Sequence, residues 1–238
     1  AGMGTVLATV QKVAQAEKII ALTKSNNEAQ IGRALLNSAA WRVGDTFELL
    51  SNLPEDLDIV ASVLPFGMRG PRSIELQASS GTKLTLQDDL GHLILVASSM
   101  KLSVNGLGLF VVPEAFFLSR NSVLQKFDAL GLGITAAFAL PSGAFAPYTR
   151  IQTYLVVVEP KVSSRMFVAQ LSTDENTNFQ LIENFKRKEE GASFELGCFI
   201  DLSVFSGIGP LRLSERFEQA KSQFGYPAVQ LGEIGIEI

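Results

Sequence analysis

The sequence is poor in the residues that crosslink a chain or bind a metal. Its 238 residues include one cysteine, Cys198, and one histidine, His92. A single cysteine excludes an internal disulfide, and one cysteine with one histidine cannot form a zinc site of the Cys/His type. Because disulfides are typical of secreted proteins, we expect a cytoplasmic protein without a metal site.

Long apolar runs and an excess of positive charge are also lacking. Hydrophobic residues make up 47% of the chain, yet no stretch approaches the roughly 18 to 20 uncharged residues that a membrane span needs. The formal net charge of -4 provides no overall attraction to nucleic acid. We therefore expect a globular chain with no membrane partner, in which any DNA contact requires a local basic patch or another domain or subunit.

The first residues carry glycines and no initiator methionine, as expected of an excerpt from a longer protein. In "AGMGTVLATVQKVAQA" a glycine turn over residues 1–4 precedes an alanine-rich run that predicts a helix over 5–16. Such a turn lets the backbone approach a nucleotide in doubly wound folds. Two glycines are also common in ordinary tight turns, so this motif alone leaves both interpretations open.

Apolar runs and amphipathic segments alternate along the first 160 residues, which predicts an α/β fold with a doubly wound, mostly parallel sheet. The short link over 142–150 suits a hairpin, so the strand over 151–160 is expected to be antiparallel to its neighbour. The predicted strands are 18–23, 41–50, 57–64, 107–113, 134–141 and 151–160. The predicted helices are 26–39, 88–104 and 122–131, and a hairpin is predicted over 73–87.

The character of the sequence changes after Lys161, where we place a soft domain boundary. Residues 1–160 form the main α/β domain in this interpretation, and residues 161–238 form a small C-terminal α+β extension. Within the extension, strands are predicted over 163–172 and 194–203, and helices over 178–191 and 211–225.

Two predicted strands end in residues that suit a ligand site. Asp45 follows one strand, and Pro65 and Phe66 follow another, at the carboxyl edge where ligands collect in open α/β sheets. Each residue also has an ordinary structural interpretation, because an aspartate can cap a helix and a phenylalanine can belong to the core. His92 has no obvious catalytic partner in the sequence and is interpreted as structural.

Four stretches resemble the S-adenosylmethionine-dependent DNA adenine-N6 methyltransferases, especially the modification subunit of type I restriction systems. They are "AGMGTVL", "RVGDTFEL", "LDIVASVLPFG" and the long run over 106–161, which is similar throughout to the later strands of that family. The end of the chain, "YPAVQLGEIGIEI", resembles the opening of a target-recognition domain. The resemblance implies a Rossmann-like methyltransferase sheet with one antiparallel strand near its end.

The resemblance also implies a cofactor, a set of site residues and partners. S-adenosylmethionine is the expected cofactor, and DNA is the expected substrate, contacted through other domains or subunits. Specificity and restriction subunits are the implied protein partners. The implied cofactor residues are Ala1, Gly2, Met3, Gly4 and Asp45. The implied catalytic residues, which would form the pocket for a flipped adenine, are Leu64, Pro65 and Phe66.

The sequence departs from the family in two motifs. Val63 and Leu64 stand where the family has the Asn and first Pro of its catalytic motif, and Thr23 stands where it has an acidic residue for the cofactor ribose. Val63 has no side-chain hydrogen-bonding group for the adenine amino group. Three hypotheses follow: an active adenine methyltransferase, a non-catalytic structural or DNA-associated module with the same fold, and a methyltransferase acting on a substrate other than DNA.

Overall fold

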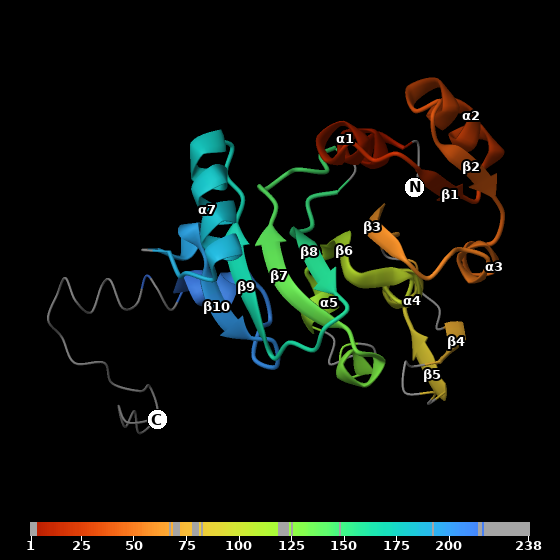
Figure 1. Ribbon diagram of the computed structural model, residues 1–238. Helices are drawn as coiled ribbons and strands as arrows, with labels where there is room; N and C mark the ends of the chain where they lie inside the picture. Colours follow the sequence, from red (N-terminus) through yellow and green to blue (C-terminus); the bar gives the residue numbers. More distant parts are fainter. Residues whose placement is uncertain are drawn as a thin grey trace, which may run out of the picture.

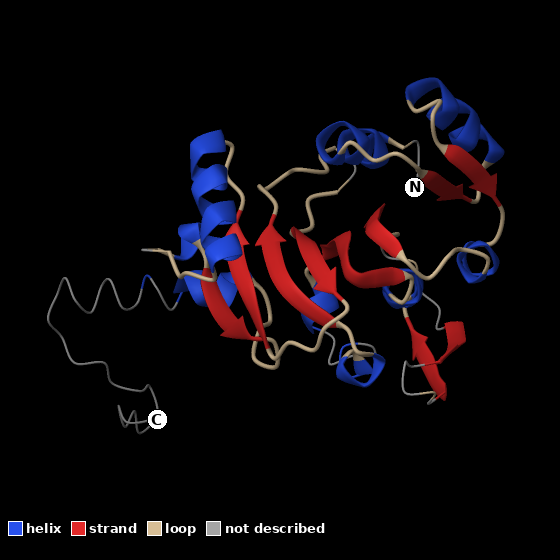
Figure 2. Ribbon diagram, in the orientation of Figure 1, coloured by secondary structure: helices blue, strands red, loops and turns tan. Residues whose placement is uncertain are grey.

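The computed structural model describes residues 4–66, 68, 72–77, 81, 83–118, 124, 126–147, 149–191, 193–213 and 216 (Figure 1). Its main body is a six-stranded sheet with helices on both faces (Figure 2). The helices are α1 (Thr5–Ala14), α2 (Asn26–Leu35), α3 (Thr46–Ser51), α4 (Leu90–Ser99), α5 (Ala115–Leu118) and α7 (Glu175–Arg187). The strands are β1 (Ile20–Thr23), β2 (Ala40–Val43), β3 (Leu57–Val63), β4 (Arg72–Gln77), β5 (Lys83–Asp88), β6 (Leu102–Pro113), β7 (Gly133–Ala139), β8 (Thr153–Glu159), β9 (Arg165–Gln170) and β10 (Cys198–Asp201).

The six strands lie in the order β10-β9-β7-β8-β6-β3. β3 is parallel to β6 and β7 is parallel to β9, whereas β8 is antiparallel to both of its neighbours. β8 is the strand that the short link over 142–150 predicts to be reversed, so this expectation is confirmed. The α/β fold class is confirmed with it, although β10 adds a second antiparallel strand at the edge.

The core lies on both faces of this sheet. One face packs against α4 and α5 and contains large buried side chains such as Leu93, Phe110 and Phe116. The other face packs against α7, which contributes the fully buried Leu181 beside Phe138 and Phe167. Because both faces are covered, the strands are apolar along most of their length, and β7 is buried at every residue.

The first strands form a smaller unit beside the main sheet. β1 and β2 pair in parallel, with Thr23 opposite Val43 at their carboxyl ends. Trp41 in β2 holds the two flanking helices, because its indole Nε1 donates to the Leu36 carbonyl at 3.2 Å and its ring lies under Gly4 and Gly32. A Cβ atom at Gly32 would lie 2.0 Å from that ring, so only glycine allows α2 to pack this closely.

The segments after residue 160 belong to the same sheet as those before it. β9 pairs with β7, and β10 pairs with β9. Further along, the Ile208 N–H donates to the Tyr154 hydroxyl oxygen at 2.9 Å, and Tyr154 donates to Glu114 Oε1 at 3.0 Å. A division into 1–160 and 161–238 would therefore fall between neighbouring strands, and it stays a prediction.

Two predicted elements are wrong in extent. Residues 41–50 are not one strand, because β2 ends at Val43 and α3 starts at Thr46, where Asp45 caps its first turn. The helix predicted over 88–104 ends at Ser99, and β6 begins at Leu102, which pairs with Leu57 of β3. In both cases a cap or a long-range strand pairing overrides the local pattern.

The strand predicted over 194–203 is also shorter in the structure, because Phe194–Leu196 form a 3-10 helix and β10 covers only Cys198–Asp201. The other predicted elements overlap elements of the structure or lie partly outside the described residues. The hairpin over 73–87 is present as antiparallel β4 and β5. Residues 122, 123 and 125 of the helix predicted over 122–131 lie outside the described residues, and Asp128–Leu130 form a 3-10 helix. Most of the helix predicted over 211–225 lies outside the described residues. Within the described part of the chain, no helix has the length and apolar character required to cross a membrane.

Candidate functional site

The candidate cofactor residues lie at the carboxyl ends of β1 and β2. Because the two strands are parallel and in register, Thr23 and Val43 end side by side, and the Gly44 N–H donates to the Thr23 carbonyl at 3.1 Å. Asp45 follows directly. The ends of neighbouring parallel strands are where α/β folds place ligands, so the sheet brings Thr23 and Asp45 to a common edge.

Asp45 caps α3. Its Oδ1 accepts hydrogen bonds from the Phe47 N–H at 3.0 Å and the Glu48 N–H at 3.3 Å. The capping interpretation of Asp45 is therefore confirmed, and it fixes the position of the carboxylate at the strand end. A cofactor role for the same carboxylate stays a prediction.

Gly4 is the described part of the predicted glycine turn, since Ala1, Gly2 and Met3 lie outside the described residues. It has a φ of 86° and forms the N-cap of α1. A Cβ at this residue would lie 2.9 Å from the Trp41 ring, so both the backbone conformation and the packing require glycine. α1 in turn contacts α2 and β3, which links this turn to the strand that carries the candidate catalytic residues.

A carboxylate that the sequence reading missed lies next to Thr23. Thr23 is 6% exposed, and its hydroxyl donates to the Glu28 carboxylate. Glu28 is near the start of α2, where its N–H donates to the Ser25 hydroxyl oxygen at 3.3 Å. The Ser25-x-x-Glu28 spacing is the signature of a capping box, which could have indicated that Glu28 folds back toward the strand end. An acidic group is thus present at this edge although Thr23 occupies the strand position.

The candidate catalytic residues follow β3. Leu64 is buried, and its N–H donates to the Val111 carbonyl at 3.2 Å, which extends the pairing of β3 with β6 by one residue. The Phe66 ring packs edge-on against Phe145 with 5.5 Å between the ring centroids. Val63, at the position of the missing Asn, is 41% exposed. The strand end therefore presents an accessible apolar side chain where the resemblance implies a polar one.

His92 has a carboxylate partner that was not obvious from the sequence, and its structural role stays a prediction. Its Nδ1 lies 2.8 Å from Asp88 Oδ1, and both side chains are more than nine-tenths buried. Asp88 Oδ2 is buried without a hydrogen-bond partner among the described residues. The i,i+4 spacing of the two residues across the start of α4 is the sequence signal that could have identified the pair.

The Asp88–His92 pair adjoins the strand end. A cavity of about 30 Å³ separates them and is lined by His92, Leu64 and Pro65, among others. A Cβ at Gly91 would lie 3.2 Å from the Pro65 carbonyl oxygen, so the first turn of α4 packs directly on the chain after β3. The pair therefore lies beside the strand end. No group of His, Cys, Asp and Glu residues in the described ranges could hold a metal ion.

No family model and no curated protein matches the chain. Solved structures with the same fold do exist. A protein of Listeria monocytogenes described as a class I S-adenosylmethionine-dependent methyltransferase aligns over 78% of this chain and 61% of its own length, with 17% identity and a TM-score of 0.53. The fold is therefore that of the class I methyltransferases.

Two further structures with this fold are subunits of type I restriction-modification systems. The methyltransferase subunit of Streptococcus thermophilus has a TM-score of 0.62 at 16% identity and is aligned over 84% of this chain and 48% of its own length. A modification subunit from Vibrio vulnificus has a TM-score of 0.61 at 14% identity, with 84% and 49% aligned. The chain spans about half the length of these subunits. The resemblance inferred from the sequence motifs is thus confirmed at the level of the fold.

Proposed function

We propose that this chain is an S-adenosylmethionine-dependent DNA adenine-N6 methyltransferase-like domain of a restriction-modification protein. One observation supports the proposal: in a chain with the fold of modification subunits, the Glu28 and Asp45 carboxylates and the Pro65-Phe66 pair lie next to the carboxyl ends of β1, β2 and β3, respectively. These are the places where open α/β sheets bind nucleotide-like ligands.

One group at this edge fits the cofactor in chemistry: the Glu28 carboxylate beside Thr23 offers an acceptor for ribose hydroxyls. Asp45 would face the adenine ring from the next strand. When bound, S-adenosylmethionine supplies an electrophilic methyl group, and the protein contributes binding and orientation.

At the end of β3, Phe66 would stack on an adenine flipped out of the duplex, and the main-chain carbonyl at Leu64 would accept a hydrogen bond from its amino group. That carbonyl is available whatever the side chain is. The side-chain acceptor is the missing part, because Val63 cannot hold the amino group in a reactive orientation. Transfer should therefore be much slower than in a chain with Asn at this position.

The exposed Val63 favours a second candidate function, a non-catalytic module that retains the methyltransferase fold. In that case the domain would bind the cofactor or contact DNA without transferring a methyl group. In either function, DNA reading would depend on other domains or subunits, since the chain has a net charge of -4. Specificity and restriction subunits are the proposed partners, and the cytoplasm the proposed location.

The test is methyl transfer from tritiated S-adenosylmethionine to duplex DNA by the full-length protein that contains this chain. Transfer that falls at least about tenfold on Phe66→Ala would support Phe66 as the stacking residue, since base stacking is worth roughly 1 to 3 kcal/mol. Phe179→Ala, on the exposed face of α7, is the matched control and should leave transfer unchanged. Equal rates for Phe66→Ala and wild type would remove Phe66 from the site. Cofactor binding without transfer would favour the non-catalytic function.

A further inference from the structure

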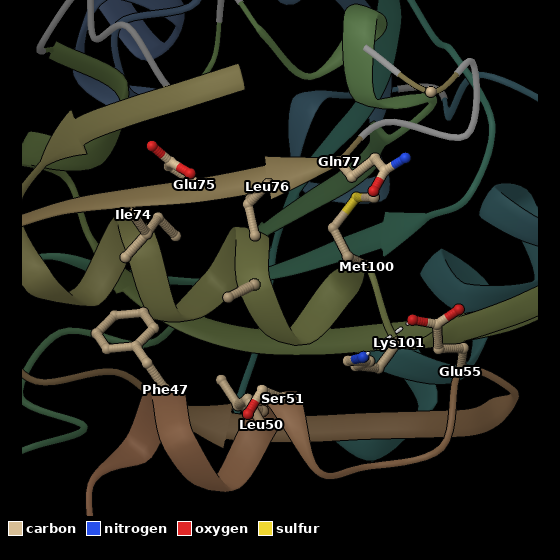
Figure 3. A pocket seen from close by; sticks show the side chains of 12 residues that line it. Phe47, Leu50, Ser51, Glu55, Ile74, Glu75, Leu76, Gln77, Met100 and Lys101 are labelled. Carbon is tan, nitrogen blue, oxygen red and sulfur yellow. Dashed lines mark hydrogen bonds and ion pairs between the residues drawn. The ribbon is translucent and has the colours of Figure 1, made fainter. Parts of the chain in front are cut away.

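A larger cavity lies at the other end of α4, away from Gly91 and His92. Its volume is about 670 Å³, and it is bordered by α3, β4 and the last turn of α4 (Figure 3). Pockets of roughly 300 to 1,000 Å³ are the size that binds small molecules. It is lined by Ala97 and the residues that follow α4, whereas the cavity at the end of β3 is lined by Gly91 and His92 in the first turn, so the two cavities are distinct; on the side of α3, the larger one begins at Phe47, two residues after Asp45.

The middle of this cavity is apolar. Phe47 and Leu50 line it from α3, Ile74 and Leu76 line it from β4, and Met100 lies between them (Figure 3). β4 is exposed at Glu75 and half-buried at Ile74 and Leu76, as expected of a strand with one face toward the cavity. A ligand that enters would therefore bury apolar surface against aromatic, aliphatic and thioether groups.

One end of the cavity holds a nearly buried positive charge. The side chain of Lys101 is 14% exposed, and its Nζ lies 3.2 Å from Glu55 Oε1, as the dashed line in Figure 3 shows. The Glu55 side chain is 82% exposed. Burying an ammonium group is costly, whereas an ion pair with a solvent-exposed carboxylate returns little free energy. Lys101 is thus a buried cation whose partner can move into solvent at little cost.

We propose that this cavity binds a small amphipathic monocarboxylate. Its apolar body packs on Phe47, Leu50 and Ile74, and its carboxylate takes the place of Glu55 at Lys101. A buried carboxylate is less screened by water than Glu55 and so compensates the ammonium charge better. A single cation favours a single negative charge, and the nearby carboxylates of Glu55 and Glu75 disfavour a dianion.

The test uses 1-naphthoate as the probe, with neutral 1-naphthalenemethanol as its uncharged match, in calorimetric titrations of the full-length protein. Naphthoate should bind saturably and more tightly than the alcohol. Lys101→Met should weaken the binding of naphthoate about 10- to 100-fold, as expected for the loss of a hydrogen bond between charged groups. The same variant should leave the affinity for the alcohol unchanged.

Two glutamate variants provide an opposite signal and its control. Glu55→Gln should strengthen naphthoate binding, because Lys101 then loses its competing partner. Glu75→Gln changes the net charge equally but does not pair with Lys101 in the structure, and its effect should be clearly smaller. The proposal is overturned by equal affinities for naphthoate and the alcohol, by unchanged naphthoate binding in a folded Lys101→Met protein, or by the absence of saturable binding.

Discussion

The carboxyl ends of β2 and β3 differ in the polar groups that they retain. Near the end of β2, the Asp45 carboxylate is held by two backbone N–H groups, and the Glu28 carboxylate is bonded to Thr23. At the end of β3, Val63 exposes an apolar side chain and Leu64 is buried. In the proposed function, cofactor binding and methyl transfer depend on different strand ends, so one can persist without the other, and each must be measured separately.

The largest loss of S-adenosylmethionine affinity is expected from Gly4→Ala. The substitution places a Cβ 2.9 Å from the Trp41 ring on a residue with a φ of 86°, so the start of α1 must move. We expect S-adenosylmethionine affinity to fall about 100-fold or more in calorimetry, because a shifted turn removes several contacts at once. Gly131→Ala is the matched control, since Gly131 has a φ of 72° but no neighbour within 4 Å of its Cβ position. Equal affinities in both variants would exclude the turn from the cofactor site.

A gain in DNA methylation is expected from Val63→Asn. Asparagine restores a side-chain acceptor at the end of β3, and the site is exposed enough to accept it without a buried polar group. We expect DNA methylation to rise at least about tenfold, with cofactor affinity unchanged. Leu64→Pro should not be added, because it removes the hydrogen bond from the Leu64 N–H to Val111. If Val63→Asn changes nothing while cofactor binds, the loss at β3 is not limited to this side chain.

Amide variants can distinguish the roles of the Glu28 and Asp45 carboxylates, which lie near the end of β2. Glu28→Gln should lower cofactor affinity about tenfold, since it weakens a hydrogen bond to a charged group. Asp45→Asn keeps an equally good N-cap, so the free energy of unfolding should stay constant while affinity falls if Asp45 also contacts the cofactor. Thermal unfolding and calorimetry on the same samples give both quantities. Unchanged affinity for Asp45→Asn would leave Asp45 as a cap only.

Tyr154→Phe is expected to have the smallest effect on cofactor binding and methylation. Burial, with the Glu114 carboxylate adding to it, raises the pKa of the Tyr154 phenol above its ordinary value of 10.0. The folded state therefore favours the neutral phenol, and this stability is fully present below about pH 10 and is lost as pH rises further.

Loss of the hydroxyl should cost about 1 to 3 kcal/mol in urea unfolding, because the buried Ile208 N–H loses its acceptor. Tyr154→Phe should also flatten the fall in stability above pH 10. Cofactor binding and methylation should be unchanged, which makes this variant a stability control for the others. A wild-type stability that is constant between pH 9 and 11 would contradict this assignment.

The sequence predicts the alternation of strands and helices well because central strands such as β7 and β8 are apolar runs of seven residues, and their burial on both faces leaves a strong pattern. It fails where contacts between distant segments decide the outcome. The pairing of Leu57 with Leu102 ends α4 early, and nothing in the local pattern after Ser99 specifies it. At the start of α3, the cap at Asp45 likewise overrides an apolar run that resembles a strand.

For the site, the sequence predicts which residues follow the strands but not what they contact. Asp45, Pro65 and Phe66 could be named from their order along the chain. The Thr23–Glu28 and Asp88–His92 pairs were missed, although a capping box and an i,i+4 spacing signal them, because neither pattern by itself shows that the side chains lie at a strand end.

The central claim is that the β1 and β2 ends still form a cofactor site. A calorimetric titration of S-adenosylmethionine into the full-length wild-type protein tests it most directly. We expect saturable binding with one cofactor per chain, at an affinity that Glu28→Gln lowers. The absence of saturable binding to a folded wild-type protein would contradict the claim and would leave the methyltransferase fold with a different role.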